Sequence, residues 1–296
     1  MTEAAATGVL APDVTTDMRA ARSHLGRRFL KNSLGVAALS VLVLIVLAAI
    51  CAPLLTSYDP NTVSVLHILQ GPGAGHLLGT DGAGRDVWAR LLYGARYTLA
   101  GALLATVVAA ILGIASGLVA GYYGKWFESA ASWVTTLLMA LPGIVVLLAA
   151  RAVLGPSLWT VMIIFGFLLI PAFYRLVFAA VSGVRNELFV DAARVSGVSD
   201  LRIITRHLLP NVITQSIVYA MSDIVQDILA IVTLSYLGLG IQPPTADWGT
   251  MISPGQNFLT TQWWLTTIPG LAVVITGLAL SLIGDGLADL LRTGTS

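Results

Sequence analysis

Long apolar runs separated by polar stretches dominate the chain. Six runs are long enough to cross a bilayer, which takes about 20 residues at a rise of roughly 1.5 Å per residue. These runs are Leu34–Leu55, Thr98–Ala120, Ser129–Ala149, Ser157–Val181, Ile213–Gly240 and Trp264–Gly284. Backbone polar groups in lipid must pair within their own segment, so each run is predicted to be a helix. The pattern therefore predicts an all-α membrane protein with about six transmembrane helices.

Prolines and glycines within the runs predict local features of these helices. Proline lacks an N–H donor and is expected to kink or interrupt a helix, here at Pro142, Pro171 and Pro269. In the second run, glycines recur every four residues at Gly113, Gly117 and Gly121. Such a stripe lets two helices approach closely, so this face is predicted to pack against another helix.

The residues before the first run are polar and basic. Met18–Asn32 mixes arginine and lysine with apolar residues, which suits an interfacial helix or a bare topology signal. The first run is longer than the roughly 7–15 apolar residues of a cleavable signal peptide, and more spans follow it. We therefore expect a tail at 1–33, a first transmembrane helix and loop at 34–97, a core at 98–292 and a C-terminal tail at 293–296.

Composition supports the membrane assignment and argues against several functions. The 296 residues are 56% hydrophobic and 10% charged, whereas a soluble domain is about 45–50% apolar and about 25% charged. A net charge of +1 gives no reason to expect nucleic acid as a partner. The single cysteine and four scattered histidines predict neither a disulfide nor a metal site. Gly124 and Lys125 lack the other residues of a Walker A loop, so the chain is not expected to hydrolyse ATP.

The distribution of lysine and arginine predicts the orientation in the membrane. Positive residues gather on the cytoplasmic side of bacterial membrane proteins. Twelve of the 16 fall on one side of the predicted spans, and the other four are Arg85, Arg90, Arg96 and Arg151. Both termini are therefore predicted to be cytoplasmic, with outward loops at 56–97, 150–156 and 241–263.

A long polar stretch on the cytoplasmic side, Val184–Asn211, carries the strongest functional signal. Its apolar spacing predicts a short helix over Glu187–Val195, and Gly197 is expected to end it with a turn in which a side chain would clash. A second helix is predicted over Leu201–Leu209, after which Pro210 should break the path into the fifth span. The first helix has one face of small and apolar residues, namely Leu188, Ala192 and Val195. That face suits a docking surface, and a solvated connector that packs on itself is the alternative.

Several motifs resemble one family of transporters. Asp191-Ala192-Ala193, Gly197 and Leu209-Pro210 are similar to the EAA loop of ABC importer permeases, with Asp191 in place of the usual glutamate. Four further stretches resemble dipeptide/oligopeptide/nickel permeases: HLLGTDGAGRDVWARLLYGAR at 76–96, GLVAGYYGKW at 117–126, LSYLGLGIQPPTADWG at 234–249 and LIGDGLADLL at 282–291. The resemblance runs from about residue 25 to 292, and the first outward loop resembles that of the C-type subunit.

The resemblance implies a type I ABC importer permease in the inner membrane, which is a transport subunit and not an enzyme. A homologous permease would supply the other half of the pathway, an extracytoplasmic binding protein would deliver the substrate, and two ATPases would bind ATP and Mg²⁺. The cytoplasmic loop at 184–211 would couple the permease to those ATPases. The residues implied in coupling are Glu187, Leu188, Asp191, Ala192, Ala193, Arg194, Gly197, Leu209 and Pro210.

The fifth run departs from the family. Ile231 occupies the place of a frequent intramembrane glutamate, and Asp223 and Asp227 lie one and two turns earlier on the same helix face. A carboxylate at membrane depth should face a polar cavity or a partner. These residues are candidates for the substrate path. A structural role is the alternative, through a bond to a neighbouring helix or a cation such as Arg175.

Two other classes of function compete with this interpretation. An ion-coupled secondary transporter could use Asp223 and Asp227, but the chain shows no inverted repeat and the EAA-type loop would have no role. A membrane-embedded enzyme would need a convergent nucleophile, base or metal set, and no such set is visible. The sequence does not distinguish dipeptides, oligopeptides, glutathione-like peptides and nickel chelates as substrates.

Overall fold

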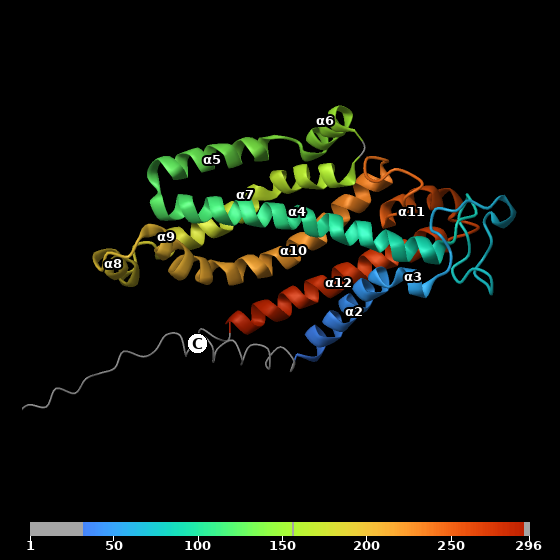
Figure 1. Cartoon of the computed structure of the whole chain (residues 1–296), viewed down its shortest axis with the longest axis horizontal. Coiled ribbons are helices and arrows are strands. Elements are labelled where there is room, and N and C mark those ends of the chain that lie inside the picture. Colours follow the sequence, from blue (N-terminus) through green and yellow to red (C-terminus); the bar gives the residue numbers. More distant parts are fainter. Residues whose placement is uncertain (1–31, 156, 293–296) are drawn as a thin grey trace, which may run out of the picture.

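The protein is a bundle of long helices, seen here in a computed structural model that describes residues 32–155 and 157–292 (Figure 1). The helices are α2 (Ser33–Ile50), α3 (Ala52–Leu55), α4 (Val87–Tyr123), α5 (Lys125–Ala140), α6 (Gly143–Leu154), α7 (Leu158–Val184), α8 (Leu188–Val195), α9 (Asp200–Ile203), α10 (Leu209–Tyr236), α11 (Trp248–Gly255) and α12 (Trp264–Arg292). Short 3₁₀ turns cover Val65–His67 and Gln256–Phe258, and a π turn covers Ile204–Leu208. In these residues the only β pairing is an isolated bridge between Thr80 and Asp86. The all-α prediction is confirmed.

Five of the helical segments are long and apolar enough to cross a membrane, and the bent pair α5–α6 would make a sixth. Helices α4 and α7 lie side by side at the centre of the bundle (Figure 1). On one side of them lie α5 and α6, and on the other side follow α10, α12 and α2. The tails predicted at 1–33 and 293–296 fall outside the described residues except for Asn32 and Ser33. The Asn32 side chain accepts a hydrogen bond from Gly35 N (3.2 Å) and caps α2.

The third predicted span is not one straight helix. It divides into α5 and α6, which meet at 84° around Leu141 and Pro142. Proline cannot continue the hydrogen bonding of the helix before it, and it forces the preceding residue into an extended conformation. Leu141 has that conformation, with φ −83° and ψ 127°. The interruption at Pro142 is therefore confirmed, and the third predicted span is a pair of helices that bends there. Pro171 and Pro269 lie inside the unbroken helices α7 and α12.

The path into the fifth span also differs from the prediction. Pro210 does not break it, because α9, the π turn and α10 follow one another as one helical segment from Asp200 to Tyr236. At the end of the π turn the Leu209 N–H donates to Ile204 O, one residue further back than in an α-helix. Pro210 then sits in the first turn of α10, where proline is tolerated.

The glycine stripe on α4 is a helix-packing surface, as predicted. A Cβ atom on Gly113 would lie 2.4 Å from Phe173 Cβ, and one on Gly117 would lie 2.8 Å from Val177 Cβ. A Cβ on Gly121 would lie 2.7 Å from Val181 Cβ, so all three positions meet α7. Carbon atoms pack at about 3.5–4.0 Å, so only glycine permits this spacing. Helices α4 and α7 therefore form one closely packed unit.

The two ends of the bundle carry different structures. The loop at 56–86 and helix α11 lie at one end, and helices α8 and α9 lie at the other (Figure 1). The first end is the one that the charge distribution assigns to the outside, and the second is the one it assigns to the cytoplasm. Helix α4 has 37 residues and runs between them, about 55 Å at a rise of 1.5 Å per residue.

Candidate functional site

Helix α8 stands at the predicted cytoplasmic end with two contrasting faces. Val190 is fully buried in an apolar cluster that α4, α7 and the start of α10 also supply. On the other face, Leu188 is 85% exposed and Val195 is 90% exposed, and Ala192 between them is exposed as well. Large apolar side chains at a surface that is predicted to face water make this face a candidate protein-binding site. The predicted face is therefore present, and nothing in the described chain covers it.

Most of the remaining predicted coupling residues lie on this helix or at its ends. Glu187 occupies the N-cap position without a capping hydrogen bond from its side chain. Asp191 and Arg194 form an ion pair across one turn, with 3.1 Å between Oδ1 and Nη1. Ala193 is partly buried against the apolar cluster. Leu209 and Pro210 are not part of this surface, because they start α10 beyond the π turn.

Gly197 makes the turn that follows α8, but not for the steric reason expected from the sequence. Its φ is +73°, a conformation that costs a residue with a side chain about 1–2 kcal/mol. A Cβ atom at this position would meet nothing within 4 Å, so the expected clash with the turn does not occur. The turn therefore requires glycine for its backbone conformation alone.

Tyr122, at the end of α4, connects the loop to the bundle and was not identified from the sequence. Its hydroxyl donates to Asp200 Oδ1 in α9 (2.7 Å) and accepts from Arg194 Nε in α8 (3.4 Å). The Arg194 guanidinium also lies over the Tyr122 ring, 5.0 Å from its centroid. The bond to the tyrosine hydroxyl raises the pKa of Arg194. The only available signal was its place in the stretch GLVAGYYGKW.

Asp223 and Asp227 face the interior of the bundle in this conformation. Thr106 of α4 donates to Asp227 Oδ2 (2.6 Å), so Asp227 joins α10 to α4. Asp227 Oδ1 and Asp223 Oδ2 are buried and have no hydrogen-bond partner among the described residues. Arg175, named above as a candidate partner, is exposed and forms no ion pair with either carboxylate.

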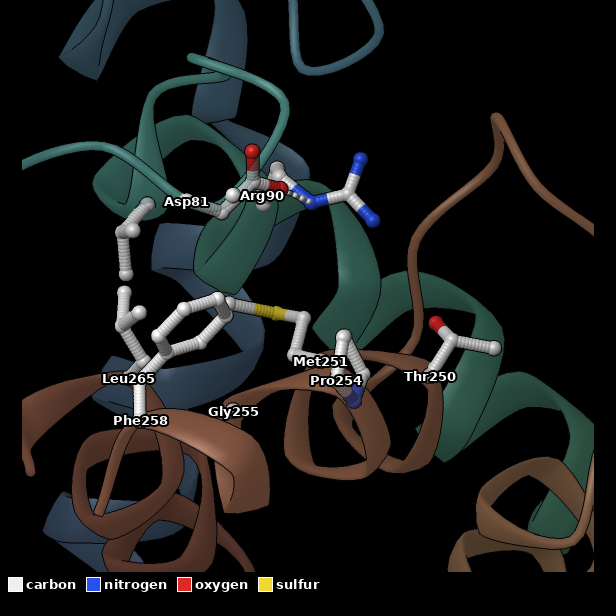
Figure 2. Close-up of a pocket in the computed structure, with 10 residues that line it drawn as sticks. Asp81, Arg90, Thr250, Met251, Pro254, Gly255, Phe258 and Leu265 are labelled. Atoms are coloured by element: carbon white, nitrogen blue, oxygen red, sulfur yellow. Dashed lines mark ion pairs between the residues drawn. The ribbon is translucent and has the colours of Figure 1, made fainter. Parts of the chain in front are cut away.

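Polar contacts join the elements at the opposite end of the bundle. Asp247 begins α11 and accepts hydrogen bonds from Ser235 Oγ (2.5 Å) and Thr250 N (2.7 Å), and burial raises the pKa of Asp247. Arg90, near the start of α4, pairs with Asp81 of the outward loop at 3.4 Å. Figure 2 shows this pair beside the side chains of α11 that line a small pocket. The pocket holds about 20 Å³, room for roughly one water molecule, so no peptide fits there.

Comparison with known families identifies the family to which this chain belongs. The family model described as "binding-protein-dependent transport system inner membrane component" matches residues 113–296, more than half of the chain. The chain belongs to that family. A second model, the N-terminal TM domain of oligopeptide transport permease C, matches residues 24–72. The permease is thus a multi-pass inner membrane protein of the C type, as the motifs indicated.

Curated relatives cover nearly the whole permease. A dipeptide transport system permease protein of Alkalihalophilus pseudofirmus is 39% identical over 88% of this chain and 86% of its own. A di/tripeptide transport system permease protein of Pseudomonas aeruginosa is 36% identical over 89% of both chains. A glutathione transport system permease protein of Pectobacterium atrosepticum is 34% identical over 90% of this chain and 88% of its own.

A solved structure shares the fold of the permease. A chain of the methionine ABC transporter MetNI, in an inward-facing conformation, superposes with a TM-score of 0.54 at 18% identity. The match covers 68% of this chain and 95% of that one. The type I ABC importer permease fold expected from the sequence is therefore confirmed.

Proposed function

We propose that this permease forms half of the pathway of an ATP-driven importer for dipeptides, oligopeptides or related small solutes such as glutathione or nickel chelates. A homologous permease would form the other half, and an extracytoplasmic binding protein would deliver the substrate. Two cytoplasmic ATPases would bind ATP and Mg²⁺. The named substrates of the relatives support the peptide class, and family membership favours an importer over an ion-coupled transporter.

We further propose that α8 is the helix on which one ATPase docks. The observation that carries this proposal is the contrast between its two faces. Val190 fixes the helix to the bundle, while Leu188 and Val195 remain open to solvent at the predicted cytoplasmic end. Burying a side chain of this size against a partner contributes about 1.5–3 kcal/mol. A pair of such residues on a fixed helix is a small but well-positioned anchor.

A docked ATPase would couple ATP binding to movement of the permease helices. When ATP closes the two ATPases, the docked loops would be drawn together and the pathway would open outward. ATP hydrolysis would then release the loops. The conformational equilibrium would thus be biased by a ligand that the permease itself does not bind.

Asp223 and Asp227 remain our candidates for the substrate path. Both are buried, and Asp227 is closed off at the contact between α10 and α4, so this role requires the bundle to open around them during transport. Once exposed, a carboxylate at this depth would attract the positive amino terminus of a peptide. The unpartnered oxygens support the proposal, because they are available to a ligand without breaking an existing bond.

The docking proposal is tested by charging the exposed face of α8. We expect the double variant Leu188→Asp/Val195→Asp to insert normally, to retain less of the ATPases on purification and to lower uptake at least about tenfold, since an ionised carboxylate cannot be buried unpaired in the interface. Uptake is measured in proteoliposomes with isotope-labelled di- and tripeptides, glutathione and a nickel–histidine chelate as probes.

The matched control is Leu66→Asp, the same change at a residue that is 88% exposed in the outward loop. It should leave ATPase retention unchanged. Normal uptake and normal ATPase retention in the α8 double variant would contradict docking at this face.

A further inference from the structure

Tyr122 lies at the end of the long helix α4 and is buried. Among the described residues, it is the one side chain of α4 that forms hydrogen bonds with both short helices of the cytoplasmic loop, α8 and α9. Only 6% of it is exposed, although its hydroxyl reaches two charged groups, Arg194 of α8 and Asp200 of α9. A buried tyrosine hydroxyl normally finds a partner. One hydrogen-bond partner would be enough to satisfy this hydroxyl. Tyr122 has two, both charged, and they lie on two different helices.

The geometry fixes the orientation of α8. Arg194 is held at three points: its guanidinium stacks on the Tyr122 ring, its Nε donates to the Tyr122 hydroxyl, and its Nη1 donates to Asp191. Val190 holds the same helix from its buried side. Because Leu188 and Val195 project from the opposite face, the angle of the exposed surface is set by these contacts.

Tyr122 also lies at the cytoplasmic end of a helix that runs the full length of the bundle. Helix α4 is continuous from Val87 to Tyr123, and its glycine stripe packs it tightly against α7. Near its first turn, Arg90 Nη1 donates to Pro60 O (2.9 Å) and Pro244 O (3.1 Å) in the loops of the outward end. A displacement of α8 that reaches α4 through Tyr122 would therefore reach the outward end through a stiff element.

We propose that Tyr122 is a positioning residue that transmits the movement of α8 to the α4–α7 unit. This inference rests on the proposed function, since it concerns the same docking helix. The tyrosine contacts neither substrate nor nucleotide in this account. Its hydroxyl holds α8 and α9 at a fixed angle to α4, so that movement of the docked loop becomes movement of the pathway helices instead of rotation of the loop alone.

The test removes only the hydroxyl. In Tyr122→Phe, the ring stays to pack and to stack on Arg194, while both hydrogen bonds are lost. The complete importer, purified through this chain and reconstituted in proteoliposomes, is measured for ATPase retention, ATP hydrolysis and uptake of isotope-labelled di- and tripeptides. We expect retention and hydrolysis to stay within about twofold of the native importer. Uptake per ATP hydrolysed should fall about tenfold, the scale of hydrogen bonds to charged groups.

Tyr174→Phe is the matched control. It removes another buried tyrosine hydroxyl, whose partner is Ser132 Oγ of α5 at 3.0 Å and not a residue of the loop. Its ratio of uptake to hydrolysis should equal that of the native importer. A merely structural role for Tyr122 would instead lower retention, hydrolysis and uptake together and leave their ratio unchanged.

Two outcomes contradict the inference: an unchanged ratio in Tyr122→Phe, or an equal fall in the control. Failure of the proposed function is distinguishable, because the native importer would then show no ATP-dependent uptake of any probe.

Discussion

At the scale of single residues, the two buried aspartates on α10 need an explanation, because carboxylates are costly at membrane depth. Placing an ionised carboxylate at membrane depth costs at least about 2.5–3.5 kcal/mol, and Asp227 offsets only part of this through its bond to Thr106. Each aspartate also keeps one oxygen without a partner among the described residues. We therefore expect these carboxylates to bind a ligand at another stage of the transport cycle.

The substitution Asp227→Asn separates charge from packing. Asparagine can still accept the hydrogen bond from Thr106, so we expect normal insertion and assembly. Uptake of peptides with a free amino terminus should fall several-fold, while ATP hydrolysis stays normal. The matched variant Thr106→Val removes the structural bond but keeps the carboxylate, and it should transport normally. If Thr106→Val fails in the same way as Asp227→Asn, or if Asp227→Asn transports normally, the aspartate has no role in the path.

Single residues also show how far sequence reasoning reaches. Gly197 was identified as the residue that ends α8, and the reason is its positive φ, which glycine commonly adopts just after the last turn of a helix, and not a clash. Tyr122 was missed, because a tyrosine at the end of an apolar helix usually marks a membrane interface. Its partners, Asp200 and Arg194, lie more than 70 residues away in the chain.

At the scale of helices, the apolar runs located every long element, because period and length directly reflect burial in lipid. The bends were harder to predict. Pro142 was expected to interrupt its helix, but the angle of 84° between α5 and α6 depends on what each half packs against. Pro210 was expected to break a helix and did not, because a π turn before it absorbs the change in hydrogen bonding. The sequence shows where proline removes a backbone hydrogen bond. Tertiary packing then determines the direction in which the chain continues.

The contact between α4 and α7 gives a prediction at this scale. In Gly117→Ala, the new methyl group would lie 2.8 Å from Val177 Cβ and 2.9 Å from Tyr174 O, so the two helices must separate. Overpacking of this kind costs about 1–3 kcal/mol, and we expect a lower melting temperature and less folded protein in detergent. In Gly270→Ala on α12, the methyl group meets nothing within 4 Å, so stability should be retained. Equal melting curves for the two variants would contradict the close packing of α4 against α7.

At the scale of the whole molecule, the permease places a polar outward end and a cytoplasmic loop at opposite ends of a rigid pair of helices. The outward end is held by contacts of Arg90 with neighbouring loops and by the hydrogen bond that Ser235 of α10 donates to Asp247. The cytoplasmic end presents the apolar face of α8. An arrangement of this kind suits a subunit that receives substrate at one end and a conformational signal at the other.

The most direct test of this account asks which protein touches α8 in the membrane. In a Cys51→Ser background, Val195→Cys would carry a photoactivatable cross-linker on the exposed face of α8, and Leu66→Cys would carry it on the outward loop. We expect Val195→Cys to form a cross-link with an ATPase subunit, in a yield that changes when ATP hydrolysis is trapped with vanadate. We expect Leu66→Cys to form none. Absence of an ATPase cross-link at Val195→Cys, in membranes where the assembled ATPases are present, would contradict this account.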